Sequence, residues 1–222
     1  MRQFDSHIEI DTSPSPTAAV IWLHGLGADG SDFVPVVPQL GLPENPGIRF
    51  LFPHAPVRPV TCNGGYAMRA WYDIYSLDEL RHEDQPGLVD AQQRIEALIQ
   101  AENERGIPTH RIVLLGFSQG GAVALYTGLR HPQRLAGIGA LSSYLPLCQT
   151  PAADYAPDNR DTPVFIAHGR QDPVVAFHLG KESRERLQQL GYPVEWKSYD
   201  MEHSVCADEI DDISAWLSNC LR

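Results

Sequence analysis

The stretch at 111–129, RIVLLGFSQGGAVALYTGL, constrains the fold of this chain more than any other part of its sequence. An apolar run at 112–115 passes abruptly into glycines around Ser118 and then into small, helix-compatible residues, which predicts a strand, a tight turn and a helix. The pattern G-x-S-x-G at such a junction is typical of a nucleophile elbow, in which a strained turn exposes the serine hydroxyl. Gly116 and Gly120 would provide the space for that turn, because neither carries a side chain.

The helix expected after Ser118 adds an electrostatic argument. Its first amide N–H groups have no acceptor within the helix, and its dipole is positive at that end. We therefore expect the N–H of Gln119 to stabilise an oxyanion that forms beside the serine. Because G-x-S-x-G also occurs by chance, a glycine-rich turn without a catalytic role is the alternative until partners for the serine are found.

Length and charge narrow the class of protein. A chain of 222 residues, 43% of them hydrophobic and 20% charged, has the size and composition of one α/β domain with a substantial core. We expect a single domain over 1–222. The formal net charge of −11 disfavours binding to nucleic acid or to anionic lipid surfaces.

Neither the start of the chain nor its cysteines indicate export. The first sixteen residues, MRQFDSHIEIDTSPSP, contain no basic region followed by a long apolar segment, and no later run approaches the ~20 apolar residues that cross a bilayer. The four cysteines, at 62, 148, 206 and 220, are scattered without metal-ligand spacing and are expected to be free thiols. A cytoplasmic location without stable membrane insertion is therefore expected.

Buried strands alternate with helices along the chain, which predicts a doubly wound and mostly parallel sheet with helices on both faces. The region at about 57–83 is rich in Pro, Gly and aromatic residues, and we expect an irregular loop there that forms part of a substrate-binding wall or a short cap. A helix at 32–40 is weakly indicated because two prolines interrupt it. Strands are expected at 4–10, 18–23, 48–52, 112–115, 135–141, 163–167 and 194–199, and helices at 86–104, after 118, at 175–190 and through 210–217.

A second glycine-rich turn, His24-Gly25-Leu26-Gly27, follows the buried strand expected at 18–23. Turns of this kind direct backbone N–H groups into the crevice at the carboxyl ends of parallel strands, where ligands bind. The N–H of Leu26 is therefore the candidate for a second oxyanion donor, and an ordinary tight turn is the alternative.

Ser118 needs a general base near neutral pH, and histidine has the proton affinity that suits this role. The chain order nucleophile, acid, histidine is expected on this kind of fold, so His24 and His54, which precede the serine, are expected to have structural roles in the crevice loops. His203 follows the strand expected at 194–199 and precedes the last helix. It lies where the base belongs.

The acid is expected in a loop after a late strand, and Asp172 follows the buried strand at 163–167. His168 and His178 flank this aspartate on the same loop and helix, so His203 is preferred as the base that approaches from an adjoining strand. Capping of the next helix is the alternative role for Asp172, and a surface histidine at a strand-to-helix junction is the alternative for His203.

Several of these motifs, taken in order, resemble those of a known family: the small α/β-hydrolase carboxylesterases, which also include acyl-protein thioesterases and lysophospholipases. The resemblance extends over nearly the whole chain, and NGGYAMRAWYDI at 63–74 is closer to the bacterial carboxylesterases of this family than to the eukaryotic protein thioesterases. The matching motifs are HGLG at 24–27, PHAPVRPVT at 53–61, WYDI at 71–74, GFSQGG at 116–121, HGRQDPVV at 168–175 and MEHS at 201–204.

We expect acyl transfer to water through a covalent intermediate at the serine, with no metal or organic cofactor. Leu26, Met68 and Trp71 are candidates for lining the acyl pocket, partly by the resemblance, although core packing is at least as good a role for Met68.

Substrate choice is open at this point. A carboxylesterase of short or medium acyl esters is the first expectation, and an acyl-protein thioesterase or lysophospholipase with the same Ser-His-Asp triad is the second. A catalytically silent hydrolase fold that acts as a binding module ranks third. The expected partner is a small acyl ester, or an acylated protein or lysophospholipid under the second hypothesis, and a homodimer is implied by the resemblance alone.

Overall fold

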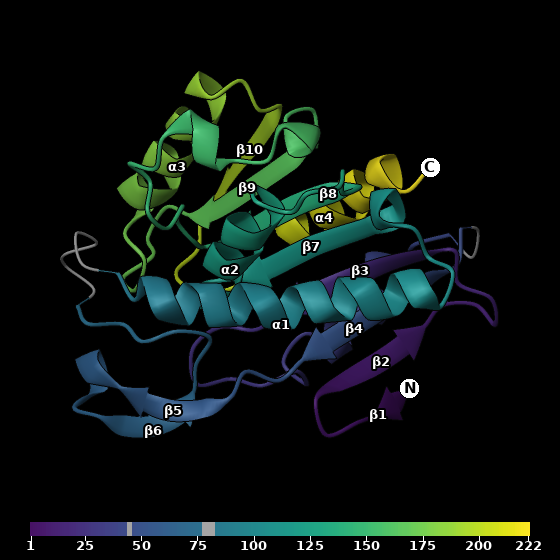
Figure 1. Ribbon diagram of the computed structural model, residues 1–222, viewed down its shortest axis with the longest axis horizontal. Helices are drawn as coiled ribbons and strands as arrows, with labels where there is room; N and C mark the ends of the chain where they lie inside the picture. Colours follow the sequence, from purple (N-terminus) through teal and green to yellow (C-terminus); the bar gives the residue numbers. More distant parts are fainter. Residues whose placement is uncertain (44–45, 77–82) are drawn as a thin grey trace.

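An eight-stranded sheet with the strand order β1-β2-β4-β3-β7-β8-β9-β10 runs through the computed structural model, which describes residues 1–43, 46–76 and 83–222 (Figure 1). The pairs β1–β2 and β2–β4 are antiparallel, and every other neighbouring pair is parallel. The strands are β1 (Arg2–Gln3), β2 (His7–Asp11), β3 (Ala18–Leu23), β4 (Ile48–Pro53), β7 (Ile112–Phe117), β8 (Gly137–Leu141), β9 (Val164–Gly169) and β10 (Val194–Tyr199).

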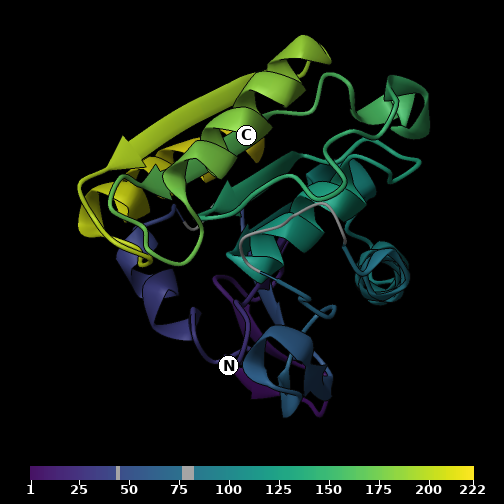
Figure 2. The same cartoon turned by 90° about the vertical axis from the view of Figure 1, so that its left-hand side faces the viewer.

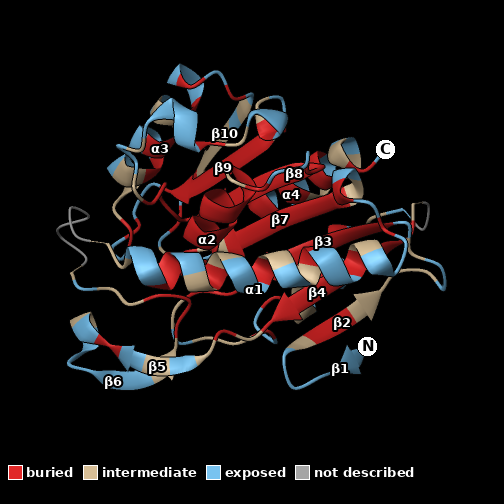
Figure 3. Cartoon of the chain, in the orientation of Figure 1, coloured by how far each residue is buried: buried red, intermediate tan, exposed pale blue. Residues whose placement is uncertain are grey.

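Helices cover both faces of this sheet and enclose two separate cores. The helices α1 (Gln85–Glu104), α2 (Gln119–Gly128) and α3 (Phe177–Gln189) pack on one face, while α4 (Ala207–Cys220) and the 3₁₀ helix η1 (Val34–Leu40) pack on the other (Figure 2). Every residue of β3, β4, β8 and β9 is buried, which explains why these strands have continuous rather than alternating apolar sequences (Figure 3). The doubly wound, mostly parallel architecture predicted from the sequence is confirmed.

The region predicted to be irregular at 57–83 contains regular structure that the sequence pattern did not indicate. Strands β5 (Val57–Val60) and β6 (Tyr66–Arg69) form an antiparallel hairpin outside the main sheet, joined through a 3₁₀ turn at Thr61–Asn63 (Figure 1). The turn depends on Gly64 and Gly65, whose φ angles are 66° and 79°. The strands have four residues each and no clear alternation, so periodicity could not reveal them; the part of the predicted loop at 77–82 lies outside the described residues.

Other departures are small. The helix weakly indicated at 32–40 is the 3₁₀ helix η1, because Pro35 and Pro38 lack the N–H groups that an α-helix requires. Of the edge strand expected at 4–10, residues 7–10 lie in β2, whereas 4–6 connect β2 to the additional short strand β1. Further short 3₁₀ helices lie at Thr109–Arg111, Ala152–Asp154 and Pro157–Asn159. In the described parts of the chain, no helix has the combination of length and apolar character that crossing a bilayer requires.

The strand order creates a crevice at one edge of the sheet. From β3 the chain continues to β4 on one side, whereas from β7 it continues to β8 on the other, so the order reverses between β3 and β7. These two strands pair in parallel, with Leu23 opposite Gly116 near their carboxyl ends. Ligands bind at such switch points in open α/β sheets, and both glycine-rich turns predicted from the sequence leave the sheet there.

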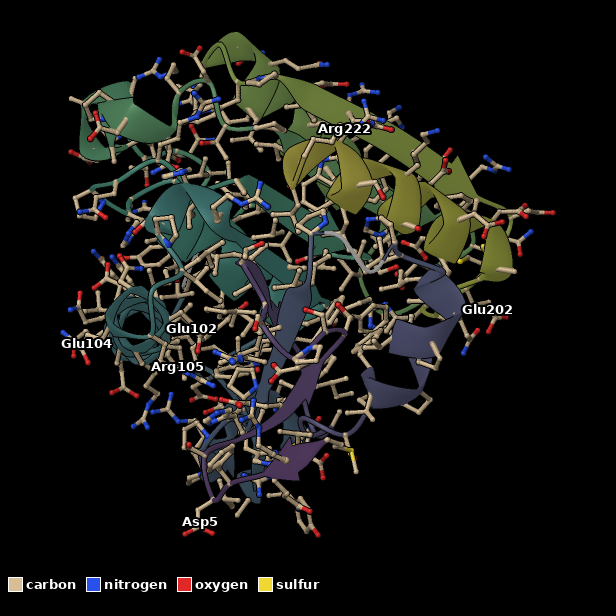
Figure 4. All side chains as sticks on the ribbon, turned by 90° about the vertical axis from the view of Figure 1, so that its right-hand side faces the viewer. Asp5, Glu102, Glu104, Arg105, Glu202 and Arg222 are labelled. Carbon is tan, nitrogen blue, oxygen red and sulfur yellow. The ribbon has the colours of Figure 1, made fainter. Side chains whose placement is uncertain are left out.

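A buried ion cluster fastens the N-terminal strands to the end of α1. Arg105 donates to both carboxylate oxygens of Glu9 and, at 2.7 Å, to Glu102, while Arg49 donates to Glu102 at 3.1 Å. Figure 4 labels Glu102 and Arg105 at this end of α1, beside the N-terminal strands. Burial by itself raises the pKa of Glu9, but the hydrogen bond and charge of Arg105, together with other partners, outweigh burial and lower that pKa to about 2.

This shift predicts a pH-dependent contribution to stability. The carboxylate of Glu9 has a lower pKa in the folded chain than in the unfolded chain, so it stabilises the fold above about pH 4.5 and loses this effect as the pH falls towards 2. We expect the Glu9→Gln variant to be less stable than the wild type at pH 6 and the difference to shrink between pH 4.5 and 2.5. Urea unfolding followed by circular dichroism at several pH values measures it, and a constant difference would contradict this assignment.

Candidate active site

The turn between β7 and α2 holds Ser118 in a conformation that side chains rarely adopt, with φ 54° and ψ −121°. A Cβ atom at Gly116 would lie 2.2 Å from the carbonyl oxygen of Gly120, and one at Gly120 would lie 2.4 Å from that of Leu23. Both glycines are therefore required by close backbone approach. This is the geometry predicted for a nucleophile elbow.

Hydrogen bonds from the next strand fix the elbow. The N–H of Ser118 donates to the carbonyl of Leu141 at 2.8 Å, at the end of β8. The hydroxyl of Ser143 donates to the carbonyl of Ser118 at 2.7 Å, and the N–H groups of Gly121 and Ala122 reach the same carbonyl. The serine backbone is thus held from both sides while its side chain lines a cavity.

The loops after β9 and β10 bring together Asp172 and His203, which lie 31 positions apart in the sequence. His203 Nδ1 lies 2.7 Å from Asp172 Oδ2, and the aspartate side chain is fully buried. This contact favours the tautomer with the proton on Nδ1, because a carboxylate only accepts hydrogen bonds. That tautomer leaves the lone pair on Nε2, as a general base requires.

The other oxygen of Asp172 organises its own loop. Asp172 Oδ1 accepts hydrogen bonds from the N–H groups of Val174 and Val175, at 2.8 and 2.9 Å. The alternative role as a helix cap does not describe this arrangement, because α3 begins only at Phe177 and its preceding residue Ala176 makes no side-chain cap. The carboxylate therefore closes a turn with one oxygen and holds the imidazole with the other.

The imidazole of His203 packs against the residue that precedes Ser118 in the elbow. Its ring lies against Phe117, with 4.7 Å between ring centroids. Among the described residues no hydrogen bond joins Ser118 Oγ to His203, and such catalytic contacts commonly tighten only when substrate is bound. The structure thus pairs Asp172 with His203 directly and places the imidazole beside the serine loop.

The two histidines that precede Ser118 and were expected to have structural roles in the crevice loops make hydrogen bonds there. His24 Nε2 accepts from the N–H of Ala55 at 3.0 Å, and His54 Nδ1 accepts from the N–H of Gly30 at 3.0 Å, so both link crevice loops. Burial lowers the pKa of His24 to about 4, which keeps the ring neutral. His178 is exposed on α3.

Two backbone N–H groups are available near the serine. Neither the N–H of Leu26 nor that of Gln119 donates a hydrogen bond to any residue in the described ranges. The side chain of Gln119 is used differently, since Oε1 accepts from the N–H of Trp71 at 2.9 Å and Nε2 donates to the carbonyl of Tyr72 at 2.8 Å. The amide side chain therefore ties the elbow to the loop after β6.

A cavity of about 200 Å³ opens beside Ser118. Leu26 lines it, as predicted, but Trp71 and Met68 do not. Trp71 is buried behind the crevice, where its indole N–H donates to the carbonyl of His24 at 2.9 Å, and the Met68 sulfur contacts Asn63. The cavity is lined by Leu26, Cys62, Asn63, Tyr72, Ile74, Ser76, Ser118, Gln119, Tyr144, Val174, Val175 and Leu179.

Comparison with known proteins agrees with this geometry. A family model described as phospholipase/carboxylesterase matches residues 6–221. The chain belongs to this family.

Relatives of known name are similar over nearly their full length. The acyl-protein thioesterase 1 of Neurospora crassa is 43% identical over 92% of this chain and 87% of that protein, and that of Cryptococcus neoformans is 39% identical over 97% and 98%. The crystal structure of Arabidopsis thaliana SOBER1 superposes with a TM-score of 0.87 at 31% identity, over 92% of this chain and 99% of that one. Zea mays acyl-protein thioesterase 2 gives a TM-score of 0.85 at 28% identity, over 97% and 99%.

This member of the phospholipase/carboxylesterase family is therefore a serine hydrolase with the α/β-hydrolase fold. Part of the cavity wall comes from the region at 57–83, where the sequence predicted a substrate-binding wall, whereas sequence reasoning missed Tyr144, Val174, Val175 and Leu179. Val175 could have been suspected because it belongs to the same motif as Asp172, whereas Tyr144 and Leu179 lie in segments with no recognisable signal.

Sequence reasoning also missed the structural role of His168, which lies close to Asp172. It is fully buried at the end of β9, with Nε2 2.8 Å from the carbonyl of Val175 and 3.5 Å from Asp172 Oδ2. Burial lowers the pKa of His168, so the ring is a neutral donor at neutral pH. It holds the loop whose N–H groups hold the aspartate.

We expect removal of the His168 donor to alter the chemistry through Asp172. In His168→Leu, a less fixed carboxylate stabilises the protonated form of His203 less, so kcat/KM for an ester should fall about tenfold or more and its acid limb should move to lower pH. His168→Gln retains an N–H donor and should lie closer to the wild type. A pH profile of ester hydrolysis measures both variants, and unchanged acid limbs would show that His168 only supports packing.

Proposed function

We propose that this serine hydrolase cleaves short- to medium-chain acyl esters, with Ser118 as nucleophile, His203 as general base and Asp172 as its partner. The observation that carries the proposal is the 2.7 Å contact between His203 Nδ1 and Asp172 Oδ2, formed beside a strained serine at the mouth of a cavity. A protein that only binds ligands would not need a strained serine together with an aspartate and a histidine in this chain order.

The mechanism follows from these positions. Ser118 Oγ attacks the ester carbonyl while His203 Nε2 takes its proton, and Asp172 stabilises the imidazolium that results. The free N–H groups of Leu26 and Gln119 hold the oxyanion of the tetrahedral intermediate, each such donor contributing about 3 kcal/mol. The protonated imidazole then gives its proton to the leaving alcohol, and water repeats the sequence on the acyl-enzyme.

The size of the cavity supports the ranking of substrates. Its volume of about 200 Å³ is smaller than the ~300–1,000 Å³ of typical small-molecule sites. A chain of a few carbons fits such a space more readily than a long fatty acyl chain. The apolar wall, with Leu26, Ile74, Val174 and Leu179, suits the hydrocarbon part of an acyl group.

A second candidate function is removal of acyl groups from protein thioesters, or hydrolysis of a lysophospholipid. It is favoured by the relatives in Neurospora crassa and Cryptococcus neoformans, both called acyl-protein thioesterase 1. The same triad would serve, because a thioester carbonyl is attacked in the same way. The closer resemblance of 63–74 to bacterial carboxylesterases stays a prediction and supports the first candidate.

Location and assembly complete the proposal. The four cysteines at 62, 148, 206 and 220 are free thiols, which supports a reducing, cytoplasmic environment. A single domain over 1–222 is supported by a family match that spans 6–221. Homodimer formation rests on the family resemblance alone.

Labelling with a fluorophosphonate tests the nucleophile. The wild type should gain one phosphonyl group by intact-mass spectrometry, because the activated serine is phosphonylated at its oxygen. Ser118→Ala should gain none, whereas Ser218→Ala, a change on α4 away from the crevice, should label as the wild type does. Labelling that persists in Ser118→Ala would show that another serine is the nucleophile, and an unlabelled wild type would favour the binding module.

A substrate series separates the two candidate functions. We expect kcat/KM for p-nitrophenyl esters to be highest between acetate and octanoate and to fall by about tenfold or more at palmitate, since the cavity cannot hold the longer chain. A palmitoylated cysteine peptide and a lysophosphatidylcholine are assayed in parallel. A kcat/KM for the peptide above that of every short ester would reverse the ranking.

A further inference from the structure

The cavity beside Ser118 contains a pair of buried tyrosine hydroxyls. The hydroxyl oxygens of Tyr72 and Tyr144 lie 2.7 Å apart, and both residues line the cavity. Tyr72 is 1% exposed and Tyr144 is 8% exposed. Burial raises the pKa of both phenols, so each keeps its proton at neutral pH.

The hydrogen bonds of this pair are incomplete. Two phenols carry two O–H donors, and only one of these can lie within the pair. Within residues 1–43, 46–76 and 83–222, neither hydroxyl has another hydrogen-bond partner. Burial raises the pKa of the neighbouring Glu83 to about 7; its Oε2 accepts from the N–H of Leu147 at 2.6 Å, and its Oε1 has no partner among the described residues. One tyrosine O–H therefore has no acceptor among the described residues and is available to a ligand in the cavity.

The surroundings make this donor selective. Gln119 places a buried amide in the cavity wall, but its side-chain oxygen and nitrogen are both hydrogen-bonded to the backbone, of Trp71 and of Tyr72. Apart from Ser118, the rest of the lining combines the aliphatic side chains of Leu26, Ile74, Val174, Val175 and Leu179 with the polar ones of Cys62, Asn63 and Ser76. In a largely apolar cavity, a buried donor in a fixed place orients a ligand that offers an acceptor in the matching place.

We propose that the cavity selects acyl groups that carry an oxygen acceptor along the chain, such as a keto, hydroxy or ether oxygen, which accepts a hydrogen bond from the Tyr72–Tyr144 pair. A simple alkyl chain would leave the O–H buried without an acceptor, and sites built around such a donor discriminate against ligands that lack the acceptor. This inference rests on the proposed function, because it concerns the acyl group delivered to Ser118.

The experiment compares p-nitrophenyl hexanoate with its oxa analogues, in which an ether oxygen replaces the methylene at C3, C4 or C5 of the acyl chain in turn. Such a replacement changes the size of the chain little. In the wild type, kcat/KM relative to hexanoate should rise by about fivefold to tenfold at one position of the oxygen, the effect of one net hydrogen bond. An oxygen near the carbonyl also changes the intrinsic reactivity of the ester. This effect cancels when the wild-type ratio of kcat/KM values, oxa ester to hexanoate, is divided by the same ratio in a variant.

The reference variant is the double substitution Tyr72→Phe/Tyr144→Phe, which keeps the rings and removes both hydroxyls. Its preference for the oxygenated chain should disappear. Each single variant, Tyr72→Phe or Tyr144→Phe, still has one O–H donor and should retain the preference, which a general packing defect would not predict. Tyr66→Phe, an exposed change on β6, serves as the matched control.

Equal ratios in the wild type and the double variant at every oxygen position would overturn the inference while hydrolysis of hexanoate upheld the proposed function. Absence of hydrolysis of all these esters would overturn both. If the double variant does not fold by circular dichroism, inhibition of the wild type by hexanoic acid and by its oxa analogues provides the second measurement. Equal inhibition constants at all positions would then contradict the proposal, and a fivefold stronger inhibition by one analogue would support it.

Discussion

The close approach of three backbone segments around Ser118 is the constraint on which the rest of the site depends. Gly116, Gly120 and the end of β3 meet so closely that no side chain fits between them. This contact forces the serine into its positive φ and places the first turn of α2 against the crevice. The strain is tolerated because β7 lies in the middle of the sheet between the fully buried strands β3 and β8, whose packing holds the turn.

Asp172 and His203 lie close together because both follow strands of the parallel part of the sheet. The carboxyl ends of β7, β9 and β10 share one edge, so loops that are distant in sequence become neighbours. The loops after β9 and β10 are then joined directly, since the N–H of Arg170 donates to Tyr199 and that of Gln171 donates to Met201. The contact between Asp172 and His203 is therefore part of a backbone network and not an isolated pair.

The sequence predicted the central sheet and the candidate triad because strong local signals marked both. Continuous apolar runs such as Ala18–Leu23 and the run at 112–115 coincide with observed strands. The glycines around Ser118 are local as well, because the backbone contacts that require them form within a few residues or with the neighbouring strand. A single chain therefore contains enough information to place the elbow.

The cavity could not be predicted in the same way. Its wall collects residues from the region at 57–83, where the sequence predicted a substrate-binding wall without naming these side chains, and from the loop after β8 and the start of α3, which have no recognisable signal in sequence. The partner of the Tyr72 hydroxyl is Tyr144, 72 positions away, and no periodicity connects the two. Trp71 is the opposite case. It belongs to a recognisable motif, but its indole N–H donates to the carbonyl of His24, and the adjacent Tyr72 lines the cavity instead.

Specificity and chemistry are mechanically coupled in this arrangement. Val175 lines the cavity, donates to Asp172 and accepts from His168, so a change in the acyl wall at this residue also moves the acid. On the opposite side, Gln119 follows the nucleophile and holds the backbone of Tyr72. A shift of the wall at Tyr72 is therefore transmitted to the backbone of Gln119, and a shift at Val175 is transmitted to the carboxylate of Asp172. Substitutions that enlarge the cavity through Leu179, which has neither link, can alter the acyl preference while the reacting groups stay in place.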